Sequence, residues 1–150
     1  MIRAVLDTNV LVSAFISVHG APRQIFNAWR NGEFELITCA SLLQELNRVL
    51  HYARVQENYG LTEAEIYAYL GLLRIVGTIV PIPDVVPAIC SDPTDDKLLA
   101  SAVVAGADYV VTGNNHVLVL SNVGPAQIVT PAAFATAILG GWQLSLPGIQ

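Results

Sequence analysis

Two kinds of apolar pattern alternate along the chain. Short apolar runs are typical of buried strands, whereas stretches with an apolar residue every three to four positions are typical of amphipathic helices. Strands are predicted at residues 2–6, 35–38, 78–82 and 107–112, with an edge strand at 127–130. Helices are predicted up to about residue 16, then at 22–30, 42–53, from 62 on, at 93–105 and at 131–139.

The predicted strands are apolar throughout, which is the pattern of a parallel sheet covered by helices on both faces. We therefore expect an α/β fold, a three-layer α/β/α sandwich around a central parallel sheet of four to five strands. The 150 residues are expected to form a single domain, 1–150, with its core at about 2–139. Gly140 and Gly141 are expected to end the last helix and to release a C-terminal tail, 140–150.

Three of the predicted helices begin with capping signals. Ser41, followed by Gln44 three residues later, predicts a capping box. Thr62 is predicted to cap the next long helix, which has acids in its first turn. Asp92 followed by Pro93 predicts the N-cap and the first residue of the helix at 93–105.

Polar residues follow the ends of two predicted strands. Asp7 comes directly after the first strand, and Thr112 and Asn114 come directly after the fourth. The segment 92–97, which contains three aspartates, opens the helix that leads into the fourth strand. Ligands of parallel α/β sheets bind beyond the carboxyl ends of the strands, so we expect these side chains to converge there.

Helix geometry adds one acid and ranks two others. At about 100° per residue, Glu45 falls on the margin of the apolar face of its helix, although a plain first-turn glutamate explains it equally well. Asp95 projects in the direction of the apolar face of its own helix, whereas Asp96 points roughly 100° away. A capping arrangement built on Asp92 would also account for Asp95 without any function.

Several carboxylates within a few ångströms repel one another and raise one another's pKa unless a cation lies between them. Mg²⁺ and Mn²⁺ prefer such hard oxygen ligands, together with water and substrate phosphate. A metal of this kind prepares a water for attack and neutralises charge at phosphorus. The acidic cluster therefore predicts metal-dependent hydrolysis of a phosphodiester.

Composition limits the partners of the chain. Only 13% of the residues are charged and the net charge is −5, which excludes broad, charge-driven binding of nucleic acid. Beyond Asp108 there is no Asp, Glu, Lys or Arg. An uncharged terminal third that contains Phe134 and Trp142 predicts a homodimer, although an uncharged polar surface is the alternative. Arg48 and Arg54 are candidate phosphate contacts, and a solvated helix face is the simpler interpretation of each.

Other features narrow the setting of the protein. No apolar run reaches the roughly 18 residues that a membrane span needs, and no leader precedes the first strand, so a cytoplasmic protein without a membrane is expected. Cys39 and Cys90 lack metal-type spacing, so neither a disulfide nor a zinc site is expected.

The ordered set of motifs resembles the PIN-domain family, in particular the ribonuclease toxins of toxin–antitoxin systems. The resemblance extends from residue 2 to about residue 135, and its motifs are LDTNVL at 6–11, Glu45, DPTDDKLL at 92–99 and GADYVVTG at 106–113. It implies the sheet described above, one or two Mg²⁺ or Mn²⁺ ions, cleavage of RNA and an antitoxin partner.

The resemblance also implies roles for individual residues. Its catalytic acids are Asp7, Glu45 and Asp95. The expected metal ligands are Asp7, Asp95, Asp96 and Asn114. The resemblance gives Thr112 as the supporting hydroxyl. From their positions beside these residues, Thr8, Asn9 and Asp92 are also expected to support the site, and Arg48 and Arg54 to contact the RNA.

One position departs from the family pattern. The family usually has an aspartate after Thr-Gly, where this chain has Asn114, and an amide brings no negative charge to a second metal. The alternative to a ribonuclease is therefore a catalytically weakened PIN module that binds RNA or a protein partner. A receiver-like signalling domain is disfavoured because Asp7 is a single acid and no aspartate ends the third predicted strand.

Overall fold

The computed structural model describes residues 1–90 and 92–144, with side chains up to residue 138. Within these residues, strands in the order β3-β2-β1-β4-β6-β5 form a single six-stranded sheet. The strands are β1 (Arg3–Leu6), β2 (Glu35–Thr38), β3 (Thr78–Ile79), β4 (Tyr109–Val111), β5 (Asn122–Val123) and β6 (Ala126–Val129). Neighbouring strands are parallel except for β5, which pairs antiparallel with β6. The parallel α/β sheet is thus confirmed, with a two-residue antiparallel strand added at one edge.

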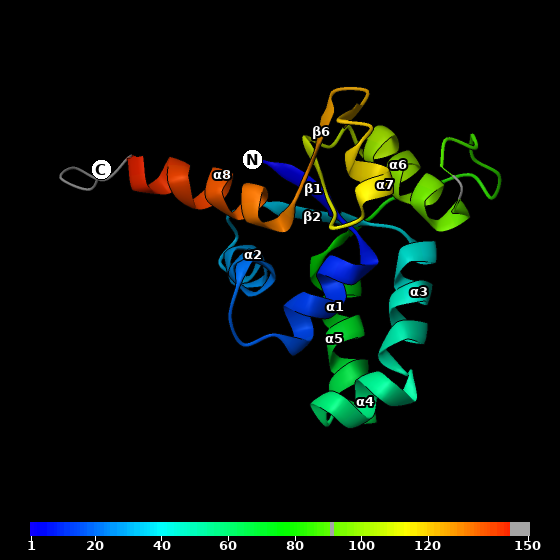
Figure 1. Ribbon diagram of the computed structural model, residues 1–150, viewed down its shortest axis with the longest axis vertical. Coiled ribbons are helices and arrows are strands. Elements are labelled where there is room, and N and C mark those ends of the chain that lie inside the picture. Colours follow the sequence, from blue (N-terminus) through cyan, green and yellow to red (C-terminus); the bar gives the residue numbers. More distant parts are fainter. Residues whose placement is uncertain (91, 145–150) are drawn as a thin grey trace.

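Helices cover both faces of the sheet (Figure 1), so the three-layer α/β/α sandwich is confirmed. The helices are α1 (Thr8–Ile16), α2 (Ala21–Arg30), α3 (Ala40–Leu50), α4 (Ala53–Tyr59), α5 (Glu63–Val76), α6 (Pro93–Ala105), α7 (Asn115–Leu118) and α8 (Pro131–Leu144). In Figure 1, α6 and α7 lie above β1 and β2, and α1, α3 and α5 lie below them. None of the described helices combines the length and the apolarity that a membrane span requires.

Successive side chains of a strand point to opposite faces, and this alternation divides the core in two. Ala4 and Leu6 of β1 belong to the cluster beneath the sheet, together with Trp29, Leu46 and other residues of the lower helices. Val5, between them, belongs to the cluster under α6. Asp7 comes next in the chain after Leu6, directly beyond the carboxyl end of β1.

Several predicted helix boundaries were wrong. The helix predicted to continue to residue 53 ends at Leu50, and after a turn with extended backbone at Tyr52 the separate helix α4 follows. The capping box at Ser41 is not formed, because α3 begins earlier, with Cys39 as its N-cap. The capping role of Thr62 is confirmed, and its box is completed by Glu65.

The C-terminal part differs most from the prediction. Helix α8 continues through Gly140 and Gly141 to Leu144, although a glycine costs a helix about 1 kcal/mol relative to alanine. The rest of the predicted tail, together with the side chain of Trp142, lies outside the described residues. The strand predicted at the edge is β6, which lies between β4 and the unpredicted strand β5.

Candidate active site

Asp7 is fixed at the carboxyl end of β1 by three hydrogen bonds. Its backbone N–H donates to the carbonyl of Val111 on β4 at 2.9 Å. Its side chain is the N-cap of α1 and accepts the backbone N–H of Thr8 at 2.7 Å. The hydroxyl of Thr112 donates to the other carboxylate oxygen at 2.6 Å. Asp7 is only 6% exposed, so its orientation is set by these contacts.

Asp95 approaches the same place from the first turn of α6. Asp92 caps this helix by accepting the backbone N–H of Thr94 at 2.9 Å, and Pro93 occupies its first turn, as predicted. Asp95 is 7% exposed, and its carboxylate accepts the side-chain amide of Asn114 at 3.2 Å. The predicted convergence of α6 on the ends of the strands is therefore present.

Thr112 and Asn114 connect the two carboxylates. The backbone N–H of Asn114 donates to the hydroxyl of Thr112 at 3.0 Å, so Thr112 contacts Asp7 on one side and Asn114 on the other. The amide oxygen of Asn114 accepts the backbone N–H of His116 and caps α7 at 2.9 Å. In this conformation Asn114 presents N–H groups to Asp95 and turns its oxygen, the atom that would bind a metal, toward α7.

Glu45 is contributed by α3. The hydroxyl of Thr8 donates to its carboxylate at 3.3 Å, and the guanidinium of Arg48 lies 3.5 Å from the other oxygen. The side chain of Glu45 is 24% exposed, whereas that of Arg48 is 64% exposed. Asn9, one residue after Thr8, is exposed on α1.

The carboxylates of this site influence one another electrostatically. Burial, followed by the charges of Asp7, Asp92, Glu45 and Asp96, raises the pKa of Asp95 to about 6. Burial also raises the pKa of Asp7, against the opposing effect of its hydrogen bonds from Thr112 and Thr8. The negative charges are thus gathered in a place that disfavours them.

The donor set fits a hard divalent cation. No three acid, histidine or cysteine side chains in the described part of the chain already converge as a preformed metal cage. Mg²⁺ does not need such a cage, because it usually takes one or two carboxylates and completes its shell with water and substrate phosphate. Asp7 and Asp95 supply the two carboxylates, and their mutual repulsion would be relieved by a cation between them.

Two of the predicted site residues have other surroundings. One oxygen of Asp96 accepts the backbone N–H groups of Ile89 and Cys90, at 2.8 and 2.6 Å. This side chain thereby ties the loop before α6 to the helix. Arg54 lies on α4, which Figure 1 shows at the end of α3 away from the sheet, so the structure does not bring it to the carboxylates. The roles assigned to Asp96 and Arg54 remain predictions.

A cleft that the sequence did not reveal adjoins the carboxylates. It has a volume of about 210 Å³ and lies between the first turns of α3 and α6. Lys97 and Arg48 line it, and the ammonium of Lys97 lies 3.3 Å from the hydroxyl of Ser41. Lys97 is the only lysine in the chain, and this is the signal in the sequence that distinguishes it.

Comparison with known proteins identifies a family and solved structures of the same fold. The family model described as PIN domain matches residues 3–116. The crystal structure of VapBC2 from Rickettsia felis bound to a DNA fragment from their promoter contains a chain that superposes with a TM-score of 0.55 at 12% sequence identity. The match covers 86% of this chain and 98% of that one, and at this identity it shows the fold alone. No curated protein matches the sequence.

Proposed function

The chain belongs to the PIN domain family, and on this premise we propose that it is a metal-dependent endoribonuclease that hydrolyses RNA phosphodiester bonds. The observation that carries the proposal is the pair of buried carboxylates, Asp7 and Asp95, joined through Thr112 and Asn114. PIN domains are generally nucleases, and this pair lies where a parallel α/β sheet binds its ligands.

In this mechanism Asp7 and Asp95 would hold Mg²⁺ or Mn²⁺, and Asp96 and Asn114 are the further ligands predicted from the sequence. When bound, the ion supplies Lewis acidity toward the phosphate and lowers the pKa of water. Thr112 keeps the carboxylate of Asp7 in a single orientation by donating its hydroxyl.

The third acid of the site, Glu45, is proposed to act as a general base. Glu45, held by the hydroxyl of Thr8 at the rim of the site, accepts the proton of the attacking water. Its partial exposure suits this role, because the proton must then pass to solvent.

Partners follow from the same premise. The chain is proposed to be the toxin of a toxin–antitoxin pair, to act as a homodimer and to work without a membrane. Support comes from the likeness of its fold to that of a chain in the VapBC2 complex and from its uncharged C-terminal third. Co-expression with the product of the adjacent reading frame, followed by purification through a tag on this chain alone, tests for a small bound partner.

The second candidate function is that of a PIN module that binds RNA without cleaving it. It is favoured by Asn114, whose amide donates to Asp95 and so partly satisfies the carboxylate that would otherwise attract a cation. In this case the natural chain binds RNA and does not cut it.

The decisive experiment is cleavage of a labelled single-stranded RNA in Mg²⁺, in Mn²⁺ and in EDTA. We expect cleavage only with a metal, and a fall of about two to three orders of magnitude in Asp7→Asn, which is the scale for loss of a charge-stabilising group. Asp84→Asn is the matched control, because it makes the same chemical change at an exposed loop position. Cleavage by Asn114→Asp with none by the natural chain would favour the binding module, and equal cleavage by Asp7→Asn and Asp84→Asn would contradict the proposed site.

A further inference from the structure

The cleft between α3 and α6 carries the opposite charge from the site beside it. Arg48 and Lys97 contribute two positive charges to its wall, and Glu45 contributes one negative charge. Glu45 is already engaged, by the hydroxyl of Thr8 and the guanidinium of Arg48. The protein as a whole has a net charge of −5, so a cationic cleft next to an acidic cluster is a local feature that the average charge does not predict.

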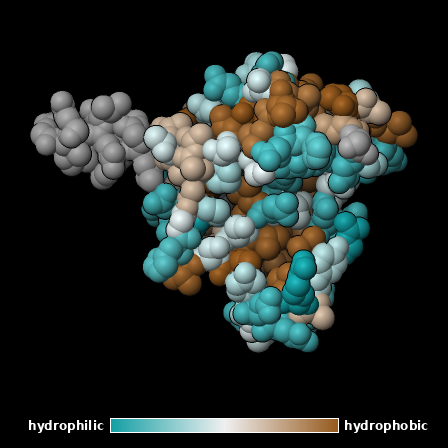
Figure 2. All heavy atoms as spheres, viewed as in Figure 1, coloured by the Kyte–Doolittle hydropathy of each residue, from teal (hydrophilic) through white to brown (hydrophobic). Residues whose placement is uncertain are grey.

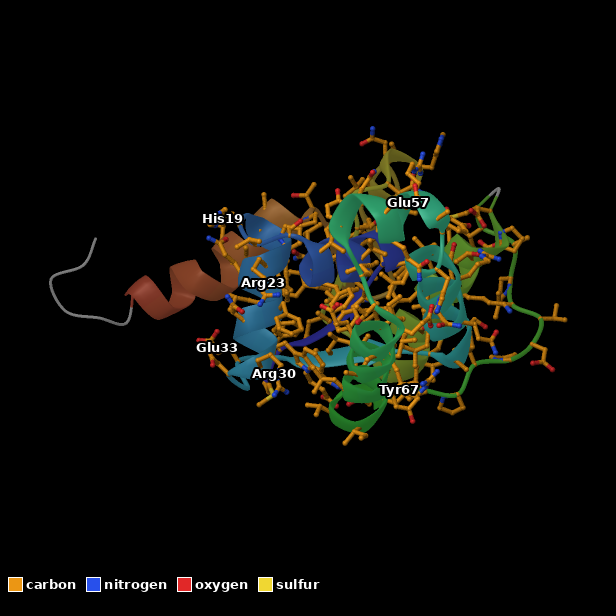
Figure 3. The ribbon with its side chains drawn as sticks, turned by 90° about the horizontal axis from the view of Figure 1, so that it is seen from below. His19, Arg23, Arg30, Glu33, Glu57 and Tyr67 are labelled. Carbon is orange, nitrogen blue, oxygen red and sulfur yellow. The ribbon has the colours of Figure 1, made fainter. Side chains whose placement is uncertain are left out.

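Other basic side chains lie away from the cleft. Arg3 forms an ion pair with Glu35 at 2.8 Å. Arg23 and Arg30 lie over the rings of Phe26 and Trp29 on α2. Figure 3 shows both of these arginines on the side of the molecule away from α3. Arg48 and Lys97 are therefore the cations with which the described part of the chain flanks its carboxylates.

The lining of the cleft is rich in hydrogen-bond donors. The hydroxyl of Ser41 lies within 3.3 Å of the Lys97 ammonium, and Gln44 and Thr94 add an amide and a second hydroxyl to the walls. An ammonium has three donors, of which Ser41 occupies one, so Lys97 has two left for a ligand. Even with Glu45 paired to Arg48, the two cations leave the wall with a net positive charge, and the neutral donors around them complete a site for an anion.

We propose that this cleft is a second phosphate subsite, in which Lys97 and Arg48 bind the backbone phosphate of the RNA nucleotide next to the scissile bond. The inference rests on the proposed function, because it takes the carboxylates as the place of cleavage. At about 210 Å³ the cleft is smaller than the roughly 300–1,000 Å³ of sites for drug-sized ligands, so it admits a phosphate with its sugar and leaves the base outside. Such a subsite positions the strand and does not select its sequence.

The subsite also explains how an acidic protein holds a polyanion. The carboxylates repel the strand, and the neighbouring cations offset this repulsion at a single step along the backbone. Lys97 follows Asp95 by two residues on α6, so the same helix turn fixes both the metal-binding carboxylate and the phosphate contact. The backbone of α6 therefore fixes the distance between Asp95 and Lys97.

The test is RNA binding by Lys97→Met and Arg48→Met, measured by fluorescence anisotropy of a labelled single-stranded oligoribonucleotide over a series of salt concentrations. The titrations are done in EDTA and again in Ca²⁺, which binds oxygen ligands and screens the carboxylates. Arg74→Met is the matched control. Arg74 is exposed in the last turn of α5, just before the start of β3, so it lies at the opposite ends of the strands from the carboxylates. Melting temperatures establish that each variant is folded, and the exposed Arg48 gives a second result independent of the half-buried Lys97.

We expect each subsite variant to weaken binding about tenfold and to reduce the slope of log affinity against log salt by about 0.7, the value for one lost phosphate contact on a single strand. In Mn²⁺ the KM for cleavage should rise with little change in kcat, because the contact is made equally before and during the reaction. Arg74→Met should match the natural chain in both measurements.

The outcomes separate this inference from the function on which it rests. Binding that depends on Lys97 and Arg48, without cleavage, would overturn the nuclease and support the cleft as a phosphate-binding site of a non-cleaving RNA-binding protein. Cleavage by the natural chain, with Lys97→Met and Arg48→Met indistinguishable from Arg74→Met, would overturn the subsite and leave the nuclease. RNA that neither binds nor is cut would overturn both.

Discussion

The charged form of Asp95 is destabilised by its surroundings in the site. Its pKa is raised to about 6, so the folded protein holds this proton more tightly than the unfolded chain, in which the pKa is near 3.8. The stability that Asp95 contributes is fully present below about pH 4 and is lost as the pH rises through about 6. Because a tenfold change in proton affinity corresponds to about 1.4 kcal/mol, the loss should reach up to about 3 kcal/mol in metal-free protein.

This pH dependence is measured by urea unfolding in EDTA across the window from pH 4 to pH 7, comparing the natural chain with Asp95→Asn. We expect the natural chain to lose stability relative to the variant as the pH rises. Glu35 acts in the opposite direction, because its contacts with Thr78 and Arg3 lower its pKa, and this contribution is common to both proteins and cancels. If the free energies of unfolding of the two proteins changed in parallel with pH, the pKa of Asp95 would not be raised by folding.

At the scale of residues, the sequence predicted what the strand ends and helix faces determine. Asp7 and Thr112 meet because they follow adjacent parallel strands, and Asp95 meets Asn114 because it lies on the apolar side of its helix. Asp96 was not placed by the same argument. Its partners are backbone N–H groups of an irregular loop, and no periodicity in the sequence indicates where such a loop passes.

Two threonines at strand ends offer a contrast between buried hydroxyls. Both Thr38, at the end of β2, and Thr112, after β4, are fully buried. Thr112 donates to Asp7, whereas the hydroxyl of Thr38 has no hydrogen-bond partner among the described residues. Valine has nearly the same shape as threonine and lacks the hydroxyl. Thr38→Val should therefore raise the free energy of unfolding by about 1 kcal/mol, and Thr112→Val should lower it by about 2 kcal/mol.

Urea unfolding of both threonine variants at neutral pH provides the test. Because the two substitutions are chemically identical, general effects of valine on the β-strands are shared and only the partner differs. A loss of stability in Thr38→Val would mean that its hydroxyl is satisfied in solution.

The loop before α6 is held to that helix by the carboxylate of Asp96. In Asp96→Ala the N–H groups of Ile89 and Cys90 lose their acceptor, so the loop should detach more often. The thiol of Cys90 reports this directly. Its pKa is raised first by burial and then by Asp96 and other acids, so removing Asp96 should also favour the reactive thiolate.

We expect Cys90 in Asp96→Ala to react with Ellman's reagent about tenfold faster than in the natural chain, the change that a loss of about 1.4 kcal/mol in the closed loop would give. Cys39 is fully buried and should remain silent in the folded protein. Asp84→Ala, in the same loop, is the control for a lost aspartate that accepts neither N–H. Equal rates in all three proteins would show that Asp96 does not hold the loop.

At the scale of elements, the prediction succeeded where the signal is long and periodic. Helix α6 and the capped start of α5 were predicted closely, because a run of apolar positions and a capping residue agree there. The one-turn helix α7 and the two-residue strand β5 were missed, since elements so short carry no period. Helix α8 continues through its two glycines because the free-energy cost of glycine in a helix is small, and the helical preference of neighbouring residues can exceed it.

Polar and apolar surface are unevenly distributed over the molecule. Figure 2 shows apolar patches along the top and upper right of the molecule, with hydrophilic residues between them, and mainly hydrophilic residues at the lower end, over α4. Val103 and Val104 on α6 are 57% and 49% exposed, and Val119, just after α7, is 76% exposed. An apolar surface of this kind is usually covered by another protein.

The homodimer predicted from the uncharged C-terminal third is therefore tested at the level of the whole molecule. Analytical ultracentrifugation at micromolar concentration should give twice the mass of the 16.0 kDa chain. The mass should be the same at low and high salt, because residues beyond Asp108 carry no Asp, Glu, Lys or Arg with which to form ion pairs. Val119→Lys should shift the protein toward monomer by placing a charge in the contact, whereas Ile75→Lys, at an even more exposed apolar position on α5, should leave the mass unchanged. A monomer at both salt concentrations would contradict the dimer, and the uncharged third would then be free surface whose solubility depends on its serines, asparagines and backbone.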